Sequence, residues 1–429
     1  MTQFRHASVA IPVLDEVENI SKMIQILCRQ TYGYFDIYVC VNNPDDWCSS
    51  ADPYHISAYR SNQETLRYLS EVSQSADMRA IGRRLHIIDC SSPGRGWAGK
   101  RKGVGWARKI LFDSIAKDHD DDELVVSLDA DTEISPDYIE TVVSEFNAWK
   151  GQEAMDRHID AQIRALAVPY YHPLSGDMVT DRAMLRYEIY MRHYLISLFD
   201  ASASFKTHIP YTFSALGSAM VFPLGGYKKV GGITPLQGGE DFYLLQKFAK
   251  AGAVVVDSEA LVKPQGRVSR RVPFGTGPAI AGGLEAMETK YPLYSYRSFL
   301  EVARTYSMFP SLYDGDKETP MSDFLRAQLS TNDLWQPLRD NFKTRAHFVH
   351  ACAERVDGLR ILQYLKSRPL TTAEEEIKSL CSRHDISISD HFCFEESPLA
   401  EIDKLRGDLF TLESMLRKGK NRCDGQMVG

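Results

Sequence analysis

The sequence lacks any apolar run long enough to cross a bilayer as a helix, which takes about 20 residues. Its opening stretch, MTQFRHASVAIPVLDE, does not fit a signal peptide, because Pro12 and Asp15 interrupt an already short apolar run. We therefore expect no transmembrane segment and a cytoplasmic location.

Cysteine pairing and excess charge are also missing. The eight cysteines are scattered without framework spacing, which indicates reduced thiols. A net charge of −7 argues against a general nucleic-acid-binding surface, although it still allows a local basic pocket for a phosphorylated small molecule. The sequence shows no internal repeat and no low-complexity segment. What remains is an ordinary soluble globular composition, with 44% hydrophobic and 25% charged residues.

The order of apolar runs predicts the fold class. Short apolar runs alternate with amphipathic stretches through the first half, as in α/β folds with a mainly parallel sheet. We expect strands at 7–13, 35–43, 85–90, 123–131, 163–171, 213–223 and 251–262. We expect helices at 15–30, about 100–116, 135–146, 181–199 and 238–252.

Helical periodicity takes over after about Tyr291, so we expect two domains, at 1–290 and 291–429. The last predicted helix carries apolar residues at three-four spacing: Leu399, Ile402, Leu405, Leu409, Leu412 and Leu416. This face should pack onto its own domain, and a homodimer through the C-terminal helix is the second possibility.

An acidic pair follows the strand predicted in LVVSLDAD. Asp129 and Asp131 stand at its carboxyl end, where open α/β sheets bind their ligands. Alternation along an extended strand would put both carboxylates on one side. Such a pair suits a hard divalent cation, Mg²⁺ or Mn²⁺, that bridges to a diphosphate. The alternative is a solvated turn that caps the next helix.

A second acidic pair, Glu240 and Asp241, begins the helix after the glycine-rich stretch LGGYKKVGGITPLQGG. Acidic residues commonly start helices because the macrodipole favours them there. The functional alternative is a carboxylate base that takes a proton from an attacking hydroxyl. Glycines such as Gly232 would let the backbone approach a ligand closely.

Two basic segments could neutralise phosphate. RVSRRVPFGTG contains Arg267, Arg270 and Arg271, and arginine pairs well with phosphate oxygens. Lys100 and Arg101 follow the loop SSPGRGWAG at a predicted helix N-terminus, which favours anions. The same loop partly matches two nucleotide-binding fingerprints, G-x-x-x-x-G-K and G-x-G-x-x-G.

Both fingerprints lack a residue that their chemistry needs. The P-loop requires a Ser or Thr for Mg²⁺ where this chain has Arg101. The dinucleotide motif requires an acidic residue at the end of the next strand, about 20 residues on, and the nearest acidic residues fall in or just after the helix.

In this order, the motifs resemble family 2 glycosyltransferases of the GT-A fold, over roughly Ala7 to Gly277. The family opens with a strand and a P-x-x-N-E stretch; here Pro12 and Glu16 match, and Asp15 replaces the usual Asn. Where the family's second strand ends in acidic or amide residues near the base, this chain has Asn42 and Asn43. The resemblance implies a Rossmann-like mixed α/β sheet with a helical C-terminal extension.

The later motifs match as well. Asp129 and Asp131 correspond to the family's D-x-D, which contacts the donor diphosphate through Mg²⁺ or Mn²⁺. Gly232 and the Glu240–Asp241 pair correspond to its G-G and E-D motifs, whose Asp is the usual base. Arg270 and Arg271 lie in an S-R-R segment that is also similar to the family's.

The resemblance implies a metal-dependent, inverting transfer from a nucleotide-diphospho-sugar donor to an acceptor hydroxyl on a glycan, a lipid-linked molecule or a small molecule. No Q-x-x-R-W motif is present, so a processive polymer synthase is not expected. Two alternatives stay open: a nucleotidyltransferase on a similar sheet, and an inactive protein that only binds a sugar nucleotide.

Overall fold

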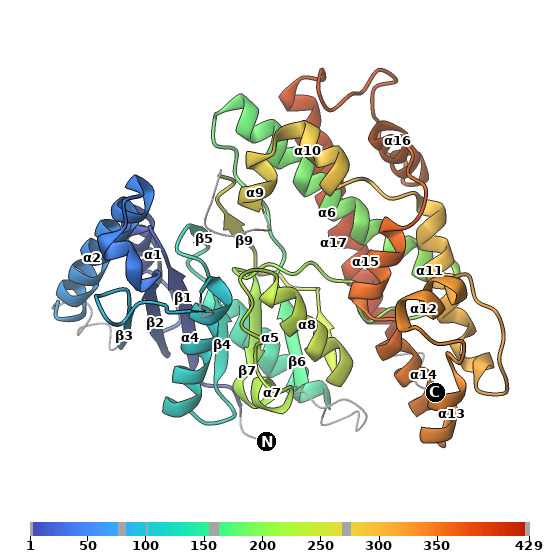
Figure 1. Ribbon diagram of the computed structural model, residues 1–429, viewed down its shortest axis with the longest axis horizontal. Helices are drawn as coiled ribbons and strands as arrows, with labels where there is room; N and C mark the ends of the chain where they lie inside the picture. Colours follow the sequence, from blue (N-terminus) through green and yellow to red (C-terminus); the bar gives the residue numbers. More distant parts are fainter. Residues whose placement is uncertain (1–2, 76–82, 100–101, 154–162, 268–275, 425–429) are drawn as a thin grey trace. The chain divides into compact units, whose positions relative to one another are not determined.

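A computed structural model describes residues 3–75, 83–99, 102–153, 163–267 and 276–424. The chain forms two compact units that interleave along the sequence (Figure 1). The first comprises Met1–Gly176 and Ala215–Ala281, and the second comprises Asp177–Ser214 and Gly282–Gly429. The functional domains predicted at 1–290 and 291–429 stay a prediction.

A mixed seven-stranded sheet forms the centre of the first unit, in the order β3-β2-β1-β4-β7-β6-β8. Strand β1 pairs in parallel with β2 and β4, whereas β7 is antiparallel to both β4 and β6. The strands are β1 (Ala7–Val13), β2 (Phe35–Asn42), β3 (Leu85–Cys90), β4 (Leu124–Ser127), β6 (Arg164–Ala167), β7 (Met220–Pro223) and β8 (Ala253–Val255). This confirms the predicted α/β class with a mixed sheet.

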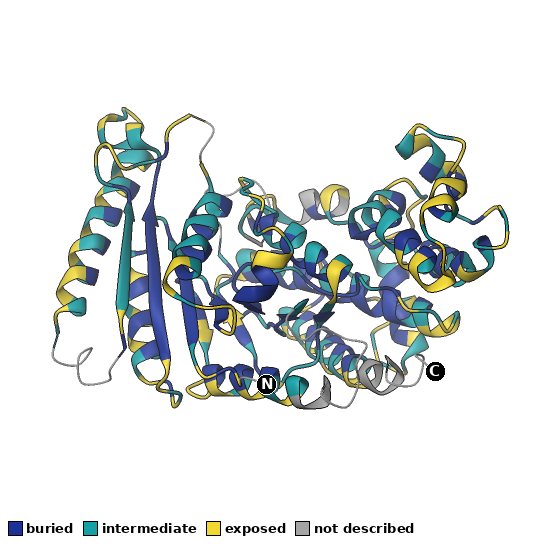
Figure 2. Cartoon of the chain, turned by 90° about the horizontal axis from the view of Figure 1, so that it is seen from below, coloured by how far each residue is buried: buried dark blue, intermediate teal, exposed yellow. Residues whose placement is uncertain are grey.

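The central strands are buried and mostly apolar because helices cover both faces of the sheet. Every residue of β2 and β4 is buried, while the edge strand β3 is mostly half-buried (Figure 2). The helices and helical turns of this unit are α1 (Val17–Cys28), η1 (Asp45–Ser49), α2 (Pro53–Ser73), α4 (Val104–Asp118), α5 (Tyr138–Glu153), α7 (Leu224–Lys229), α8 (Glu240–Ala251) and α9 (Thr276–Ala281).

Several elements differ from the expectation. The strands expected at 123–131, 163–171 and 213–223 are shorter, as β4, β6 and β7. Helix α2 was not predicted, since Leu69 is the one large apolar residue among the four buried on it, and the others are Ala58, Asn62 and Thr65. Helix α5 begins at Tyr138 rather than at residue 135, and the hydroxyl of Ser135 donates to the Asp137 carboxylate at 2.5 Å. The segment 251–262 is no single strand: β8 ends at Val255, and β9 (Val262–Pro264) pairs with β5 (Thr132–Ile134) in a separate two-stranded sheet.

The second unit is helical in its described part. The long helix α6 (Met178–Ser204) packs against α17 (Leu399–Asp424). A buried ion pair joins the two helices: Arg192 of α6 lies 2.6 Å from Glu413 of α17. The other helices are α10 (Gly283–Lys290), α11 (Tyr296–Leu312), α12 (Ser322–Leu329), α13 (Gln336–Asn341), α14 (Arg345–Arg355), α15 (Gly358–Lys366) and α16 (Ala373–Arg383).

The apolar seam of α17 is used inside this unit, where Ile402, Leu405 and Leu409 are buried. A homodimer through the same helix stays a prediction. Within the described ranges, no helix combines the length and the apolar character that a membrane crossing demands.

Candidate functional site

The carboxyl ends of β1, β2 and β4 meet at one edge of the sheet, because these strands run parallel. Pro12 stands near the end of β1, beside Cys40 of β2, and Asn42 ends β2. Asp129 follows β4 by two residues. The fold therefore gathers at one edge several residues that the sequence singles out.

Asp129 and Asp131 occupy a turn and not an extended strand. Strand β4 ends at Ser127, and the amide of Thr132 donates to the carbonyl of Asp129 at 3.2 Å. The expected alternation along a strand is therefore wrong. The turn instead gives each carboxylate its own arginine: Arg108 for Asp129 and Arg267 for Asp131.

Arg108 is the central cation of this edge. It lies on the buried side of α4, and its guanidinium contacts Asp129 at 2.6 Å and also pairs with Glu240. Burial opposes the charge of Arg108, but the Asp129 and Glu240 carboxylates outweigh that effect and raise its pKa. Two acidic motifs that are far apart in sequence are thus held by one side chain.

Gly217 provides the space for that guanidinium. A Cβ at this position would overlap the end of the Arg108 side chain, so only glycine fits without a shift. The carbonyl of Gly217 accepts from the hydroxyl of Ser127, the last residue of β4. The segment at Gly217 is therefore held close to the end of β4 by a hydrogen bond and lies directly against the Arg108 guanidinium.

Glu240 and Asp241 begin α8, as predicted. Glu240 is 1% exposed, whereas Asp241 is partly buried and its carboxylate accepts from the amide of Phe242 at 2.7 Å. Burial and the neighbouring Glu240 carboxylate raise the pKa of Asp241 to about 7, although Arg108 acts in the opposite direction. Asp129 also contributes to this rise, so the two acidic motifs share one electrostatic environment.

A second arginine ties β1 to the acidic turn. Arg267 lies 2.8 Å from Asp131 and also pairs with Glu16, which is 6% exposed. Asn19 donates to the other Glu16 oxygen at 2.6 Å. The preceding residue, Asp15, has a left-handed backbone with φ of 57°, and its amide donates to the Asn62 side chain at 2.9 Å.

The Asn42 amide is held by protein groups. It donates to the carbonyl of Val13 at 2.9 Å and accepts from the indole of Trp97 at 3.0 Å. Trp97 belongs to the glycine-rich loop, which lies so close to the end of β2 that a Cβ on Gly96 would stand 2.5 Å from the Cα of Asp45. These glycines therefore shape a close backbone contact, and Asn42 anchors it.

Gly232 accepts at its carbonyl from Lys247 of α8 at 2.7 Å, and its amide donates to the carbonyl of Tyr227 at 2.9 Å. Four of the predicted donor-binding residues, Lys100, Arg101, Arg270 and Arg271, lie outside the described residues.

Sequence reasoning missed Arg108, yet a signal was available. Residues Ala107, Leu111, Phe112 and Ile115 form the apolar face of this helix, and Arg108 falls on that buried face. A guanidinium there needs a buried carboxylate partner. The sequence gives no comparable signal for the partners, because only the tertiary fold brings Asp129 and Glu240 next to Arg108.

The carboxylates at this edge fit a hard divalent cation. Asp129 has a side chain that is 38% exposed, and Arg108 engages only its Oδ1 atom in the described contacts. Asp131 is reached by the partly exposed Arg267, whose side chain is 34% exposed. Oxygen ligands of this type suit Mg²⁺ or Mn²⁺, which bind one or two carboxylates together with phosphate oxygens.

The sequence matches no protein-family model and no curated protein. Among solved structures, the chain is similar to S. aureus TarS 1–349 in complex with UDP-GlcNAc, at 12% identity over 82% of this chain and 91% of that chain, with a TM-score of 0.38. It is also similar to a mannosyltransferase from Pyrobaculum calidifontis in complex with GDP-Man and Mn²⁺, at 13% identity over 97% and 88% of the two chains, with a TM-score of 0.35.

A third similar structure is glucosyl-3-phosphoglycerate synthase from Mycobacterium tuberculosis in complex with Mn²⁺, UDP and glucosyl-3-phosphoglycerate. The identity is 18% over 61% of this chain and 70% of that chain, with a TM-score of 0.33. These identities and TM-scores are too low to indicate an activity for this chain.

Proposed function

We propose that the chain is a glycosyltransferase of the GT-A type, similar to family 2. It would transfer a sugar from a nucleotide-diphospho-sugar donor to an acceptor hydroxyl, with inversion at the anomeric carbon. One observation carries the proposal: Arg108 joins the D-x-D turn to the start of α8, which brings a metal-type carboxylate pair and a base-type carboxylate to one edge of the sheet.

Asp241 is the proposed base. A general base works best when its pKa lies near the working pH, and burial beside Glu240 raises the pKa of Asp241 to about 7. The acceptor oxygen would attack the anomeric carbon as its proton moves to Asp241 and the bond to the donor phosphate breaks. Glu240, held by Arg108, would stay beside Asp241, and its negative charge would help to keep the pKa of Asp241 raised.

Asp129 and Asp131 are the proposed ligands of Mg²⁺ or Mn²⁺. When bound, the ion would supply positive charge to the departing nucleoside diphosphate. Arg267 already faces Asp131 and is partly exposed, so it can turn from the carboxylate to a phosphate oxygen of the donor.

The remaining donor contacts are assigned by position and by the family pattern. Pro12 and Asn42 lie at the ends of β1 and β2, Glu16 directly precedes α1, and Gly232 lies before α8. The basic residues Lys100, Arg101, Arg270 and Arg271 are proposed to neutralise the diphosphate. Asn42 would act through the backbone around it, since its amide is engaged by Val13 and Trp97.

The test is a donor screen followed by a transfer assay. Nucleotide sugars are added with Mn²⁺, and the one that raises the melting temperature most is assayed for transfer and hydrolysis, because a bound donor stabilises by mass action. Asp241→Asn should bind this donor with Mn²⁺ and lose transfer by about 100-fold or more. Glu133→Gln, which changes an exposed carboxylate near the D-x-D turn, is the matched control.

Two results would contradict the proposal. If the unchanged chain binds a nucleotide sugar with metal but neither transfers nor hydrolyses it with any acceptor class, the chain is a binding protein. If Asp241→Asn transfers at the normal rate, another group is the base.

A further inference from the structure

A group of side chains gathers at the opposite edge of the same sheet, where the strands begin. We call it the histidine cluster, and it consists of His6, Asp36, His86 and His119. His6 precedes β1, Asp36 is the second residue of β2, His86 is the second of β3, and His119 directly follows α4. The proposed active site lies at the carboxyl ends of these strands, so the two groups are separate.

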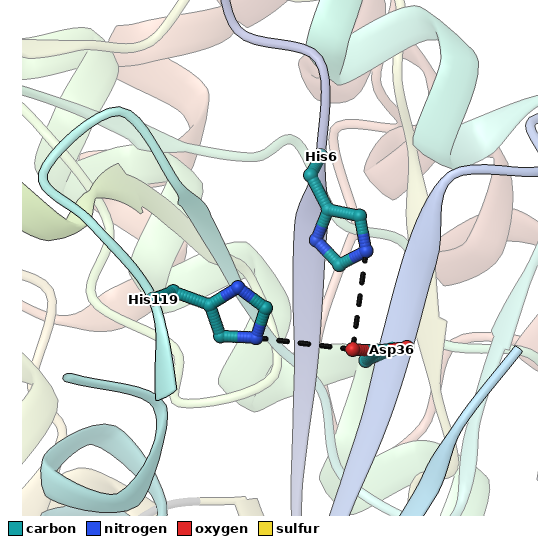
Figure 3. Close-up of side chains that lie close together, drawn as sticks. All are labelled: His6, Asp36 and His119. Atoms are coloured by element: carbon teal, nitrogen blue, oxygen red, sulfur yellow. Dashed lines mark ion pairs between the residues drawn. The ribbon is translucent and has the colours of Figure 1, made fainter. Parts of the chain in front are cut away.

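The imidazoles of the histidine cluster converge on one oxygen. The Nε2 atoms of His6 and His86 each lie 3.9 Å from Oδ2 of Asp36, and Nε2 of His119 lies 3.8 Å from it. Figure 3 shows the rings of His6 and His119 turned toward this carboxylate. Three imidazoles from separate segments of the chain thus approach this carboxylate, and the ligand atoms of His6, Asp36 and His119 all lie within 4.8 Å of one another.

Glu123 stands behind the rings and orients two of them. It accepts from Nδ1 of His6 at 2.9 Å and lies 3.4 Å from Nδ1 of His119. A proton on each Nδ1 leaves the Nε2 lone pair directed at the cluster. Carboxylates that hold the far nitrogen of a histidine in this way are the usual outer partners of metal-binding imidazoles.

The third imidazole is also positioned. The ring of His86 stacks on Tyr38, with the ring centroids 4.1 Å apart and the planes 2° apart. Its Nε2 is shielded from solvent and has no hydrogen-bond partner among the described residues. A buried ring nitrogen without a partner is costly, and a metal ion would satisfy it.

We propose that the histidine cluster binds a divalent transition-metal ion of the zinc class, through its three Nε2 atoms and one oxygen of Asp36. Imidazole nitrogen and carboxylate oxygen are ordinary zinc ligands, and bond lengths near 2.0–2.1 Å place tetrahedral ligands about 3.4 Å apart. The three Nε2–Oδ2 separations of 3.8 to 3.9 Å exceed this value by about half an ångström. The ligand atoms of His6, Asp36 and His119 already lie within 4.8 Å of one another, whereas the ring of His86 has to shift further toward them to become the fourth ligand.

Arg84 competes for the same carboxylate. Its Nη2 lies 2.6 Å from Oδ2 of Asp36, while its side chain is 67% exposed. It can therefore turn into solvent when another cation takes its place at Asp36. The side chains of His6 and His86 are 33% and 30% exposed, which leaves an entry path for an ion.

The experiment measures Zn²⁺ binding by the full chain in competition with a chromophoric chelator. Asp129→Asn and Asp131→Asn are combined in every sample, so that the proposed Mg²⁺ or Mn²⁺ site does not contribute. One equivalent of zinc should bind, and His86→Ala or His119→Ala should weaken it by about 100-fold or more. His350→Ala, in the helical unit and 59% exposed, is the control and should leave binding unchanged.

Two further variants separate a metal site from an accidental cluster of histidines. Glu123→Gln should weaken zinc by about 10- to 100-fold, as for other outer partners of ligating histidines. Arg84→Ala should tighten zinc by about tenfold, because it removes a competing cation and keeps every ligand. A loss of affinity in Arg84→Ala would contradict the proposal.

Cobalt provides a readout that does not depend on the variants folding. Co²⁺ bound by the chain that keeps the histidine cluster should give the intense visible absorption of a four-coordinate site. Weak six-coordinate absorption, no zinc bound above background, or equal losses in His86→Ala and His350→Ala would each overturn the proposal.

Discussion

Replacing Arg108 by Met should destabilise the protein more than any surface substitution nearby. Met keeps most of the side-chain volume but removes the only cation that contacts Glu240 in the described structure. Glu240 is 1% exposed, so its carboxylate would remain buried beside Asp241 without a counter-charge. The acidic turn at Asp129 would also lose its anchor.

The expected loss is about 3–5 kcal/mol in the free energy of unfolding at pH 8, which is typical when one partner of a buried ion pair is removed. A buried carboxylate without a cation has a raised pKa. It therefore binds a proton in the folded state more readily than in the unfolded state, and the deficit relative to the unchanged chain should shrink as the pH falls from 8 to 5.

Urea unfolding at several pH values measures both effects. Lys109→Met is the matched control, because Lys109 is the next residue and forms a partly exposed pair with Asp113 at 2.7 Å. Such a helical surface pair is worth only about 0.3–0.5 kcal/mol. If Arg108→Met does not fold, Arg108→Lys takes its place, with a smaller loss.

A double-mutant cycle decides the cause. Adding Glu240→Gln to Arg108→Met should recover about 1–3 kcal/mol, because the orphaned charge is gone. A deficit that stays the same at every pH, together with no recovery in the double variant, would refute the argument from an unpaired buried charge.

Four further predictions follow from the same edge of the sheet. Asp241→Asn should raise the free energy of unfolding by about 1–3 kcal/mol at pH 8 and by almost nothing at pH 3. The reason is that an aspartate whose pKa is raised in the folded protein makes that protein less stable as the pH rises through about 7. Urea unfolding measures this, and a variant less stable than the unchanged chain at pH 8 would contradict it. In transfer assays, kcat/KM should rise tenfold with each unit of increasing pH up to about 7 and should stay constant above it, because Asp241 acts as a base only after it has lost its proton. Gly217→Ala should cost about 1–3 kcal/mol and reduce transfer, since the Arg108 guanidinium must move; Gly315→Ala, with open space around it, is the thermal-unfolding control. Removing divalent cations with a chelator should abolish transfer and added Mn²⁺ should restore it, whereas full activity without metal would sink the role given to Asp129 and Asp131.

The sequence was most informative where burial alone sets the structure. Strand β1 has the predicted bounds, because its apolar run ASVAIPV is buried almost throughout. The half-buried edge strand β3 also has the predicted bounds. Helix α2 escaped prediction because its inner face includes Asn62 and Thr65, whose burial depends on partners elsewhere in the fold. The local hydrophobic pattern of a sequence does not predict a helix face on which polar residues are buried.

The site shows the same division. The motif at Asp129 and the acidic start of α8 stand out in the sequence, because each lies at the end of a recognisable element. That Arg108 joins them could not be read from spacing, since the contact spans 132 residues along the chain. The histidine cluster could not be predicted from the sequence either, because its members come from four separate segments and form no motif.

The interleaving of the two units restricts how the protein can be cut. Strands β6 and β7 are neighbours in the sheet, yet the chain between them includes α6, which belongs to the helical unit. A chain shortened to end at residue 290 would keep α6 and lose α17, leaving the buried side chains of Leu195 and Leu198 on a helix stripped of its main partner. Such a fragment would be prone to aggregate, so a minimal version of the sheet unit requires replacing residues 177–214 with a short linker as well.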